Sequence, residues 1–233
     1  SWGIVSGKAR NDNRKVTPQI FRWMGVVTEE KMNRKNNKTV KLAMMAVLTA
    51  LIFALQFITV PLGAITVSLS MVPVAIAAIT MGPVYGLLTG AIWGLASIMK
   101  AMIGSSGLTS TLFALQPFFA VILCFIPRML DGYLLGWLYK LLHKKLPVLV
   151  SGCITGFFAA LLNTIFFMST IVLLYGNTDV IQNMMGGKNV IVFICGIIAG
   201  NAIFEMIFSA VVTGPVAFAL KKAKLVQPEA KPE

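Results

Sequence analysis

Apolar residues follow one another along this chain in long, uninterrupted stretches. From Leu42 to Met99 the sequence contains no Asp, Glu, Lys or Arg, a run of 58 residues. A helix needs about 20 apolar residues to cross the hydrocarbon core of a bilayer, so this run alone holds two or three spans. The strands of an outer-membrane barrel would instead alternate polar and apolar residues. The pattern therefore predicts an all-α membrane protein.

Breaks at proline, glycine and charged residues divide the apolar sequence into six predicted membrane-spanning helices. The expected spans are residues 40–59, 67–81, 84–100, a fourth from about Leu112 to His143, 148–174 and 190–219. The fourth is ambiguous because Pro117 and Pro127 interrupt it, so it either continues to His143 or ends at Pro127. The stretch between the last two spans, residues 177–189, is expected to be a polar loop.

The composition excludes several classes of protein. Apolar residues make up 57% of the 233 residues and charged residues only 12%, and the mean hydropathy is +0.83. A soluble domain carries about 25% charged residues, so a soluble enzyme and a disordered chain are excluded. The 3 cysteines lie far apart in apolar stretches, which indicates buried thiols and neither a disulfide scaffold nor a metal site.

The charge distribution predicts the orientation in the membrane. The net charge is +12, and half of the 20 basic residues precede Leu42. No basic stripe with interleaved aromatic residues follows, which argues against binding of nucleic acid. With six spans, the basic N-terminus, the cluster at Lys140, Lys144 and Lys145 and the basic C-terminus fall on one side. Both termini are therefore expected to be cytoplasmic.

Three regions follow from these patterns. Residues 1–39 are expected to be a basic N-terminal segment that is disordered or partly vector-derived. Residues 40–220 are expected to form the six-helix membrane domain, and residues 221–233 a cytoplasmic tail.

Small residues recur at a spacing of four in several spans, which places them on one helix face. Gly86, Gly90 and Gly94 do so in the third span, and we interpret them as packing contacts inside the bundle. A second stripe, in the first span, consists of Ala46, Ala50 and Ala54. It is the candidate surface for a partner helix.

Polar residues inside the predicted spans are the candidate binding site, because a charge within a span is costly and usually functional. Lys140 is twelve residues after Arg128, or about 18 Å along a helix, which places Arg128 in the outer half of the membrane if the span continues. Counting along the other helices brings further polar side chains to a similar depth. The candidates are Arg128, Asn163, Thr164, Asn201, Glu205, Gln56, Ser68, Ser70 and Lys100.

These residues suit a pocket for a small polar solute that opens to the outside. The alternative is a set of internal hydrogen bonds in which Arg128 pairs with Glu205 or Asp131. The sequence has neither a His-Glu-x-x-His nor a Gly-x-Ser-x-Gly element, and it has no phosphate-binding Gly-x4-Gly-Lys loop. We therefore expect no catalytic residue, metal or cofactor, and no binding of ATP through such a loop by this chain.

Several motifs, taken in order and spacing over residues 40–220, resemble those of substrate-binding S-components of energy-coupling factor (ECF) transporters. They are Ala46-x-x-x-Ala50, the stretch 61–73 leading into Gly82-Pro83-x-Tyr85-Gly86, Pro127-Arg128, Asn163-Thr164 and Asn201-x-x-x-Glu205. The last three are most similar to the pantothenate-type members. The long basic N-terminus departs from the family pattern.

The resemblance implies a vitamin-capture subunit in the prokaryotic plasma membrane. Such subunits join a membrane coupling (T) subunit and two ABC-type ATPases, and the alanine stripe would contact the coupling subunit. Pantothenate is the expected substrate, with pyridoxine, hydroxymethylpyrimidine or riboflavin as alternatives. A self-sufficient channel or secondary transporter is the alternative of another class.

Overall fold

The computed structural model describes residues 39–58, 60–62, 65–67, 69–105, 108–187, 189 and 203–223. A first helix, Thr39–Phe57, is followed by the strands β1 (Val60–Leu62) and β2 (Ile65–Val67). The remaining elements are helices: α2 (Met71–Met81), α3 (Pro83–Met102), α4 (Leu108–Leu115), α5 (Pro117–His143), α6 (Val148–Tyr175), α7 (Asp179–Met185) and α9 (Ile203–Lys222). The chain divides into two units after Ala43, and the packing below concerns residues 44–223.

Within the described part of the chain, five helices are long and apolar enough to cross a membrane: Thr39–Phe57, α3, α5, α6 and α9. The helix α2 has 11 residues, which corresponds to about 16 Å and is shorter than a hydrocarbon core of about 30 Å. The residues before Ile203 in the predicted sixth span lie outside the described residues. The fold is thus a helical membrane protein with five candidate spans and one shorter apolar helix.

The segment before α2 corrects the predicted second span. Its first residues form an antiparallel hairpin in which Val60 pairs with Val67 and Leu62 with Ile65. Valine, isoleucine and threonine favour extended backbone, and Pro61 lacks the N–H that a helix interior needs. The expected second span, residues 67–81, therefore begins later in the structure, because Val67 belongs to β2 and α2 starts at Met71. Apart from this short hairpin, the described elements are helices.

The fourth predicted span is two helices. Gln116 is extended (φ −147°, ψ 90°) between α4 and α5, because a proline disfavours helical backbone at the preceding residue. Pro117 then occupies the first turn of α5, where its missing N–H costs nothing. In contrast, α5 continues through Pro127 to His143, so the interpretation that the helix ends at Pro127 is wrong. The expected polar loop at residues 177–189 also contains a short helix, α7.

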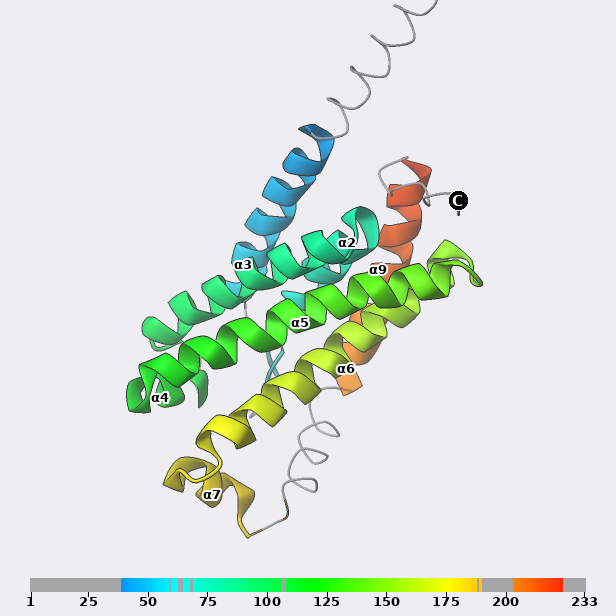
Figure 1. Ribbon diagram of the computed structural model, residues 1–233. Helices are drawn as coiled ribbons and strands as arrows, with labels where there is room; N and C mark the ends of the chain where they lie inside the picture. Colours follow the sequence, from blue (N-terminus) through cyan, green and yellow to red (C-terminus); the bar gives the residue numbers. More distant parts are fainter. Residues whose placement is uncertain are drawn as a thin grey trace, which may run out of the picture. The chain divides into compact units, whose positions relative to one another are not determined.

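Neighbouring helices α3 and α5 lie side by side at very close range (Figure 1). A Cβ atom added at Gly90 would overlap the backbone carbonyl of Arg128, and one at Gly86 would overlap that of Gly132. The glycines therefore allow direct backbone contact between the helices. The packing interpretation of this stripe is confirmed, and the contact fixes the backbone of Arg128 against α3.

Replacing Gly90 with valine is expected to destabilise the protein strongly. The added side chain has no space against the Arg128 carbonyl, and overpacking of this kind costs about 1–3 kcal/mol or more. Thermal unfolding in detergent, followed by size-exclusion chromatography, measures the effect. The matched control is Leu95→Phe, which adds bulk at an exposed position of the same helix. Equal melting temperatures for the two variants would contradict the close-contact interpretation.

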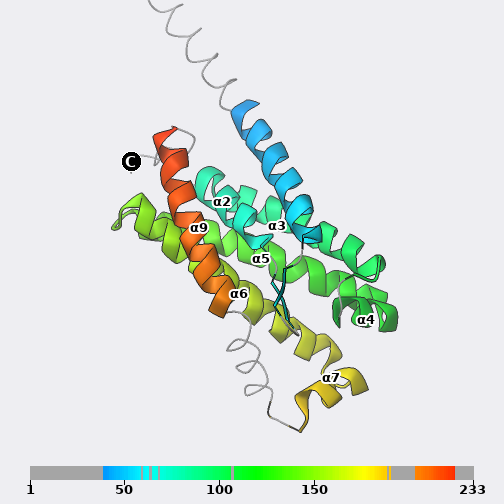
Figure 2. The ribbon, with the colours of Figure 1, turned by 180° about the vertical axis from the view of Figure 1, so that it is seen from behind.

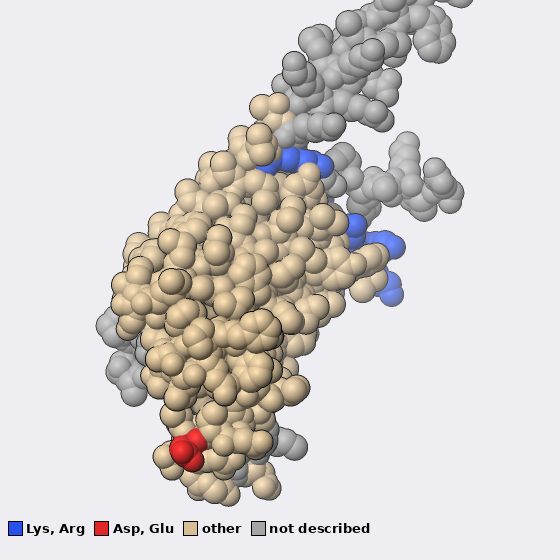
Figure 3. Space-filling model, turned by 60° about the vertical axis from the view of Figure 1, so that its left-hand side comes forward, with Lys and Arg blue, Asp and Glu red and all other residues tan. Residues whose placement is uncertain are grey.

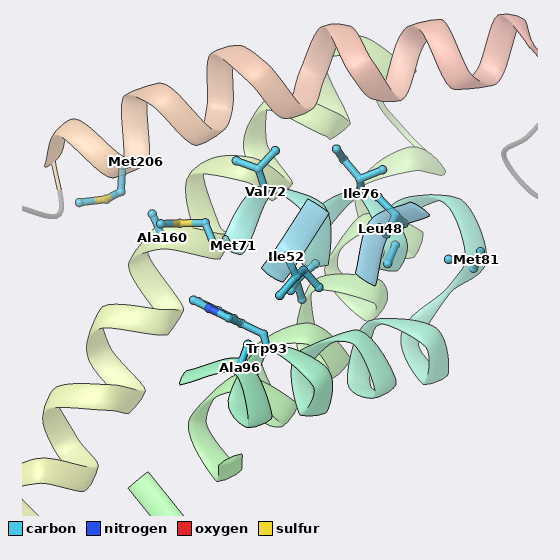
Figure 4. Close-up of a cluster of buried hydrophobic side chains, with 12 residues drawn as sticks. Leu48, Ile52, Met71, Val72, Ile76, Met81, Trp93, Ala96, Ala160 and Met206 are labelled. Atoms are coloured by element: carbon cyan, nitrogen blue, oxygen red, sulfur yellow. The ribbon is translucent and has the colours of Figure 1, made fainter. Parts of the chain in front are cut away.

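The buried core joins the first helix to the rest of its unit (Figure 4). Leu48 and Ile52 of the first helix pack with residues of α2, α3, α6 and α9, among them Met71, Trp93 and Met206. Seen from behind, α2 lies between this helix and α9, and the hairpin lies below the end of this helix (Figure 2). The end of the first helix is thereby held next to α3, where the polar residues described next lie.

Candidate functional site

Gln56, at the end of the first helix, is the centre of a buried polar cluster. Its Oε1 accepts hydrogen bonds from Ser70 Oγ and Trp93 Nε1, both at 3.0 Å. Its Nε2 donates to Ser97 Oγ at 3.2 Å, and its backbone carbonyl accepts a hydrogen bond from Lys100 Nζ at 2.7 Å. All five side chains are buried, and we call them the Gln56 cluster. It joins the first helix, the start of α2 and α3.

Three members of the cluster come from one face of α3. Trp93, Ser97 and Lys100 are separated by four and three residues, the spacing that stacks side chains along a helix. The sequence analysis identified Lys100 alone and missed Trp93 and Ser97. The spacing from Lys100 back to a serine and a tryptophan was the signal that could have found them.

Arg128 lies on α5 beyond Pro127 and is 8% exposed. Its Nη1 donates to the Cys124 carbonyl one turn earlier, at 3.0 Å. Its guanidinium carbon lies 4.8 Å from the centre of the Trp93 ring and 5.3 Å from that of Phe167, on α6. Aromatic faces attract cations at such distances, so the guanidinium is held by two rings and one carbonyl. Phe167 is a further residue that the sequence analysis missed.

The guanidinium has hydrogen-bonding capacity that the described residues do not use. Arg128 Nε is buried and has no hydrogen-bond partner among them. An arginine carries five N–H donors, and a buried donor without an acceptor is costly. A ligand oxygen at the edge of the guanidinium would remove this cost. The arrangement is therefore suited to bind an anionic group.

Two further polar groups near this level also lack partners. Neither carboxylate oxygen of Asp131 nor Oδ1 of Asn163 has a hydrogen-bond partner in the described part of the chain. Arg128 contacts Phe167, and Leu135 packs in one cluster with Ala159. In this antiparallel pairing Asp131 and Asn163 lie at the same level, one turn from the guanidinium. The predicted alternative of a hydrogen-bonded Arg128–Asp131 pair is not formed.

The remaining candidate binding residues of the sequence analysis do not belong to the Gln56 cluster. Thr164 donates its hydroxyl to the Ala160 carbonyl at 2.9 Å, inside its own helix. Glu205 is buried in the first turn of α9, beside Met206, which belongs to the same core cluster as Ala160. Ser68 and Asn201 lie outside the described residues. The structure thus brings Gln56, Ser70 and Lys100 together in the Gln56 cluster. Arg128 contacts this cluster through the ring of Trp93.

Trp93 connects the two parts of the site. Its Nε1 binds Gln56, and its ring lies against the Arg128 guanidinium. Among the described residues no group of three His, Cys, Asp or Glu side chains is placed to hold a metal ion. Of the two buried cations in this site, Lys100 already donates to the Gln56 carbonyl, whereas Arg128 keeps a buried Nε without a partner among the described residues. Arg128 is therefore the group suited to bind an anion.

The alanine stripe of the first helix lies outside the core. Ala46, Ala50 and Ala54 are all exposed. The opposite face of the same helix carries Leu48 and Ile52 into the core. A surface of small side chains therefore remains available for close approach of another helix.

Comparison with known proteins agrees with this architecture. The family model of the substrate-specific component of ECF transporters matches residues 40–217. The chain belongs to this family. An S-component is a multi-pass plasma-membrane protein that recognises the transported substrate and is not itself an enzyme.

Two curated relatives of this S-component are transporters of one vitamin. The pantothenic acid transporter of Lactococcus lactis subsp. cremoris (strain MG1363) is 28% identical over 207 residues, which cover 82% of this chain and 98% of the relative. The pantothenate transporter of Leuconostoc mesenteroides subsp. mesenteroides (strain ATCC 8293) is 31% identical over 194 residues, or 78% of this chain and 92% of the relative. The similarity extends over almost the whole of both relatives.

Proposed function

We propose that this S-component binds pantothenate and carries it across the membrane, with Arg128 binding the substrate carboxylate. The observation that carries the proposal is the buried guanidinium with an unpartnered Nε. A guanidinium holds a carboxylate through two parallel, charge-assisted hydrogen bonds. Pantothenate has one carboxylate, one amide and two hydroxyls. Its charge matches the one cation that two aromatic rings hold in this site.

The other candidates would serve the neutral groups of the substrate. Asn163 and Asn201 supply both donors and acceptors for an amide or a hydroxyl, and Thr164 supplies a hydroxyl. Glu205 would orient Arg128 or accept a hydrogen bond from a substrate hydroxyl, since beside a carboxylate it would repel. Further candidates for the lining of the pocket are Gln56, Ser68, Ser70 and Lys100. The unpaired Oδ1 of Asn163, near the level of the guanidinium, supports its part in this set.

The proposal includes a topology of six crossings with both termini in the cytoplasm. Close contacts of Gly152 with Ala217 and of Gly156 with Ser209 make α6 and α9 antiparallel, so the C-terminal ends of α5 and α9 lie at the same end. Exposed lysines gather there, at Lys140, Lys144, Lys145, Lys221 and Lys222. Figure 3 shows basic side chains at one end of the surface and acidic ones at the other. This asymmetry supports a cytoplasmic position of the basic end.

The proposed complex contains a T subunit and two ABC-type ATPases, which supply the energy. The exposed stripe of Ala46, Ala50 and Ala54 is the proposed contact with the T subunit. Small side chains allow two helices to approach closely.

Binding of pantothenate to the purified protein tests the proposal. In isothermal titration calorimetry we expect saturable binding of pantothenate and no comparable heat with pyridoxine, hydroxymethylpyrimidine or riboflavin. Mass spectrometry after mild purification should identify retained pantothenate together with the T and ATPase subunits. Tighter binding of one of the other vitamins would contradict the choice of substrate. Uptake into liposomes that contain this chain alone would instead indicate a self-sufficient transporter.

A further inference from the structure

Trp93 lies between the buried amide of Gln56 and the guanidinium of Arg128. Its Nε1 donates to Gln56 Oε1 at 3.0 Å, and its ring centre is 4.8 Å from the guanidinium carbon. Trp93 is 1% exposed and Gln56 is 7% exposed. One side chain thus contacts both the polar cluster at the end of the first helix and the proposed carboxylate-binding residue.

We propose that Gln56 and Trp93 are positioning residues that set the preference of the site for a carboxylate by holding the Arg128 guanidinium in place. This inference rests on the proposed function, because it concerns the binding of the substrate carboxylate by Arg128. It assigns to Gln56 a role through Trp93 in place of direct contact with the substrate.

The orientation of the Gln56 amide is determined by its partners. Its Oε1 accepts from two donors, Ser70 Oγ and Trp93 Nε1, while its Nε2 donates to Ser97. The flipped amide would direct its NH2 group at the indole N–H, and two donors cannot bond. Because indole has a single N–H donor, its bond to Gln56 fixes the rotation of the Trp93 ring about its side-chain torsion angles.

The fixed ring determines where the guanidinium lies. Cations bind to the face of an aromatic ring, whereas carboxylates bind guanidinium N–H groups in the plane of the group. The Trp93 ring and a substrate carboxylate therefore do not compete for the same part of Arg128. The guanidinium carbon lies over the Trp93 ring, while Nε has no hydrogen-bond partner among the described residues. The contact with the ring therefore leaves this donor for the ligand.

The same cluster ties this arrangement to the end of the first helix. Lys100 Nζ donates to the Gln56 backbone carbonyl at 2.7 Å, and a cation at the last carbonyls of a helix is favourable. The side chain that fixes Trp93 thus comes from the first helix, which also carries the exposed alanine stripe. A change in the position of this helix end would change the support of Arg128.

Affinities for pantothenate and for its uncharged alcohol, pantothenol, test the inference. In Gln56→Met, which keeps the volume and loses the acceptor, the preference for pantothenate should fall by about tenfold, a loss within the range of one cation–π contact. The affinity for pantothenol should stay within about twofold, because in this inference both residues act through Arg128 and not through the neutral groups of the substrate. Trp93→Phe, which keeps a ring and loses the N–H, should reduce the preference in the same direction. Thr89→Ala is the control on α3, since the Thr89 hydroxyl binds only carbonyls of its own helix among the described residues.

A second arm repeats Gln56→Met in the Arg128→Ala background. A residue that acts through Arg128 has no further effect there, so the two single losses should not add. A full additional loss of pantothenate affinity would show direct substrate contact or a general structural role, and would overturn the inference. Wild-type preference in both Gln56→Met and Trp93→Phe would overturn it as well. The proposed function fails instead if the wild-type protein shows no preference for pantothenate over pantothenol. It also fails if Arg128→Ala keeps the full wild-type preference for pantothenate.

Discussion

Replacing Arg128 with alanine is expected to lower the affinity for pantothenate by about 30-fold to several-thousand-fold, the equivalent of ~2–5 kcal/mol for the loss of one partner of a buried charged pair. The guanidinium is buried between two aromatic rings and keeps an unpartnered Nε. The substrate carboxylate is its expected partner. Isothermal titration calorimetry with the purified protein measures the change.

Pantothenol separates the loss of charge recognition from general damage. The wild-type protein should prefer the acid over the alcohol, and Arg128→Ala should lose most of this preference. Arg128→Lys should also weaken binding of the acid, because lysine cannot form the planar fork. If Arg128→Ala keeps the wild-type preference, Arg128 is not the carboxylate site. Lys100 is then the next candidate, although its Nζ already donates to the Gln56 carbonyl.

Replacing Ala50 with tryptophan is expected to abolish vitamin uptake while leaving binding to the isolated protein nearly unchanged. Ala50 is exposed between Ala46 and Ala54 on the outer face of the first helix. A large ring there prevents the close approach of a partner helix. It adds no atoms to the core, which the opposite face of the helix forms with Leu48 and Ile52.

Uptake into cells and calorimetry on the purified variant measure the two activities separately. Leu95→Trp, at an exposed position of α3, is the matched control and should support normal uptake. Parallel loss of binding and uptake in Ala50→Trp would mean that the stripe serves internal packing. Normal uptake in this variant would exclude the stripe as the contact with the T subunit.

Hydropathy alone predicted the membrane class and most of the helices. The first helix and the helices α3, α5 and α6 lie where long apolar runs required them, because a span of this length can satisfy its backbone only as a helix. The glycine stripe of α3 was likewise interpreted correctly as a packing surface. In these cases a short stretch of sequence is enough for the prediction, because the need for a helix and the small size of glycine are both local properties.

Short segments were predicted less well. The hairpin at residues 60–67 and the break at Gln116 both depend on backbone preferences next to proline, and these are weak beside hydropathy in an apolar stretch. Pro127 shows the opposite case. A proline inside a helix removes one hydrogen bond, yet α5 continues past it, packed against α3 on one side and α6 on the other.

The candidate site was predicted in its residue types and only partly in its connections. The sequence identified Arg128, Gln56, Ser70 and Lys100 as polar groups in an apolar setting. Only the tertiary structure brought Trp93 between Gln56 and Arg128 and left Asp131 without a hydrogen bond among the described residues. The cost of burying a polar group is a property of the residue and can be inferred from sequence. The hydrogen-bond partner of such a polar group depends on how helices far apart in the chain pack together, because this packing determines which side chains come into contact.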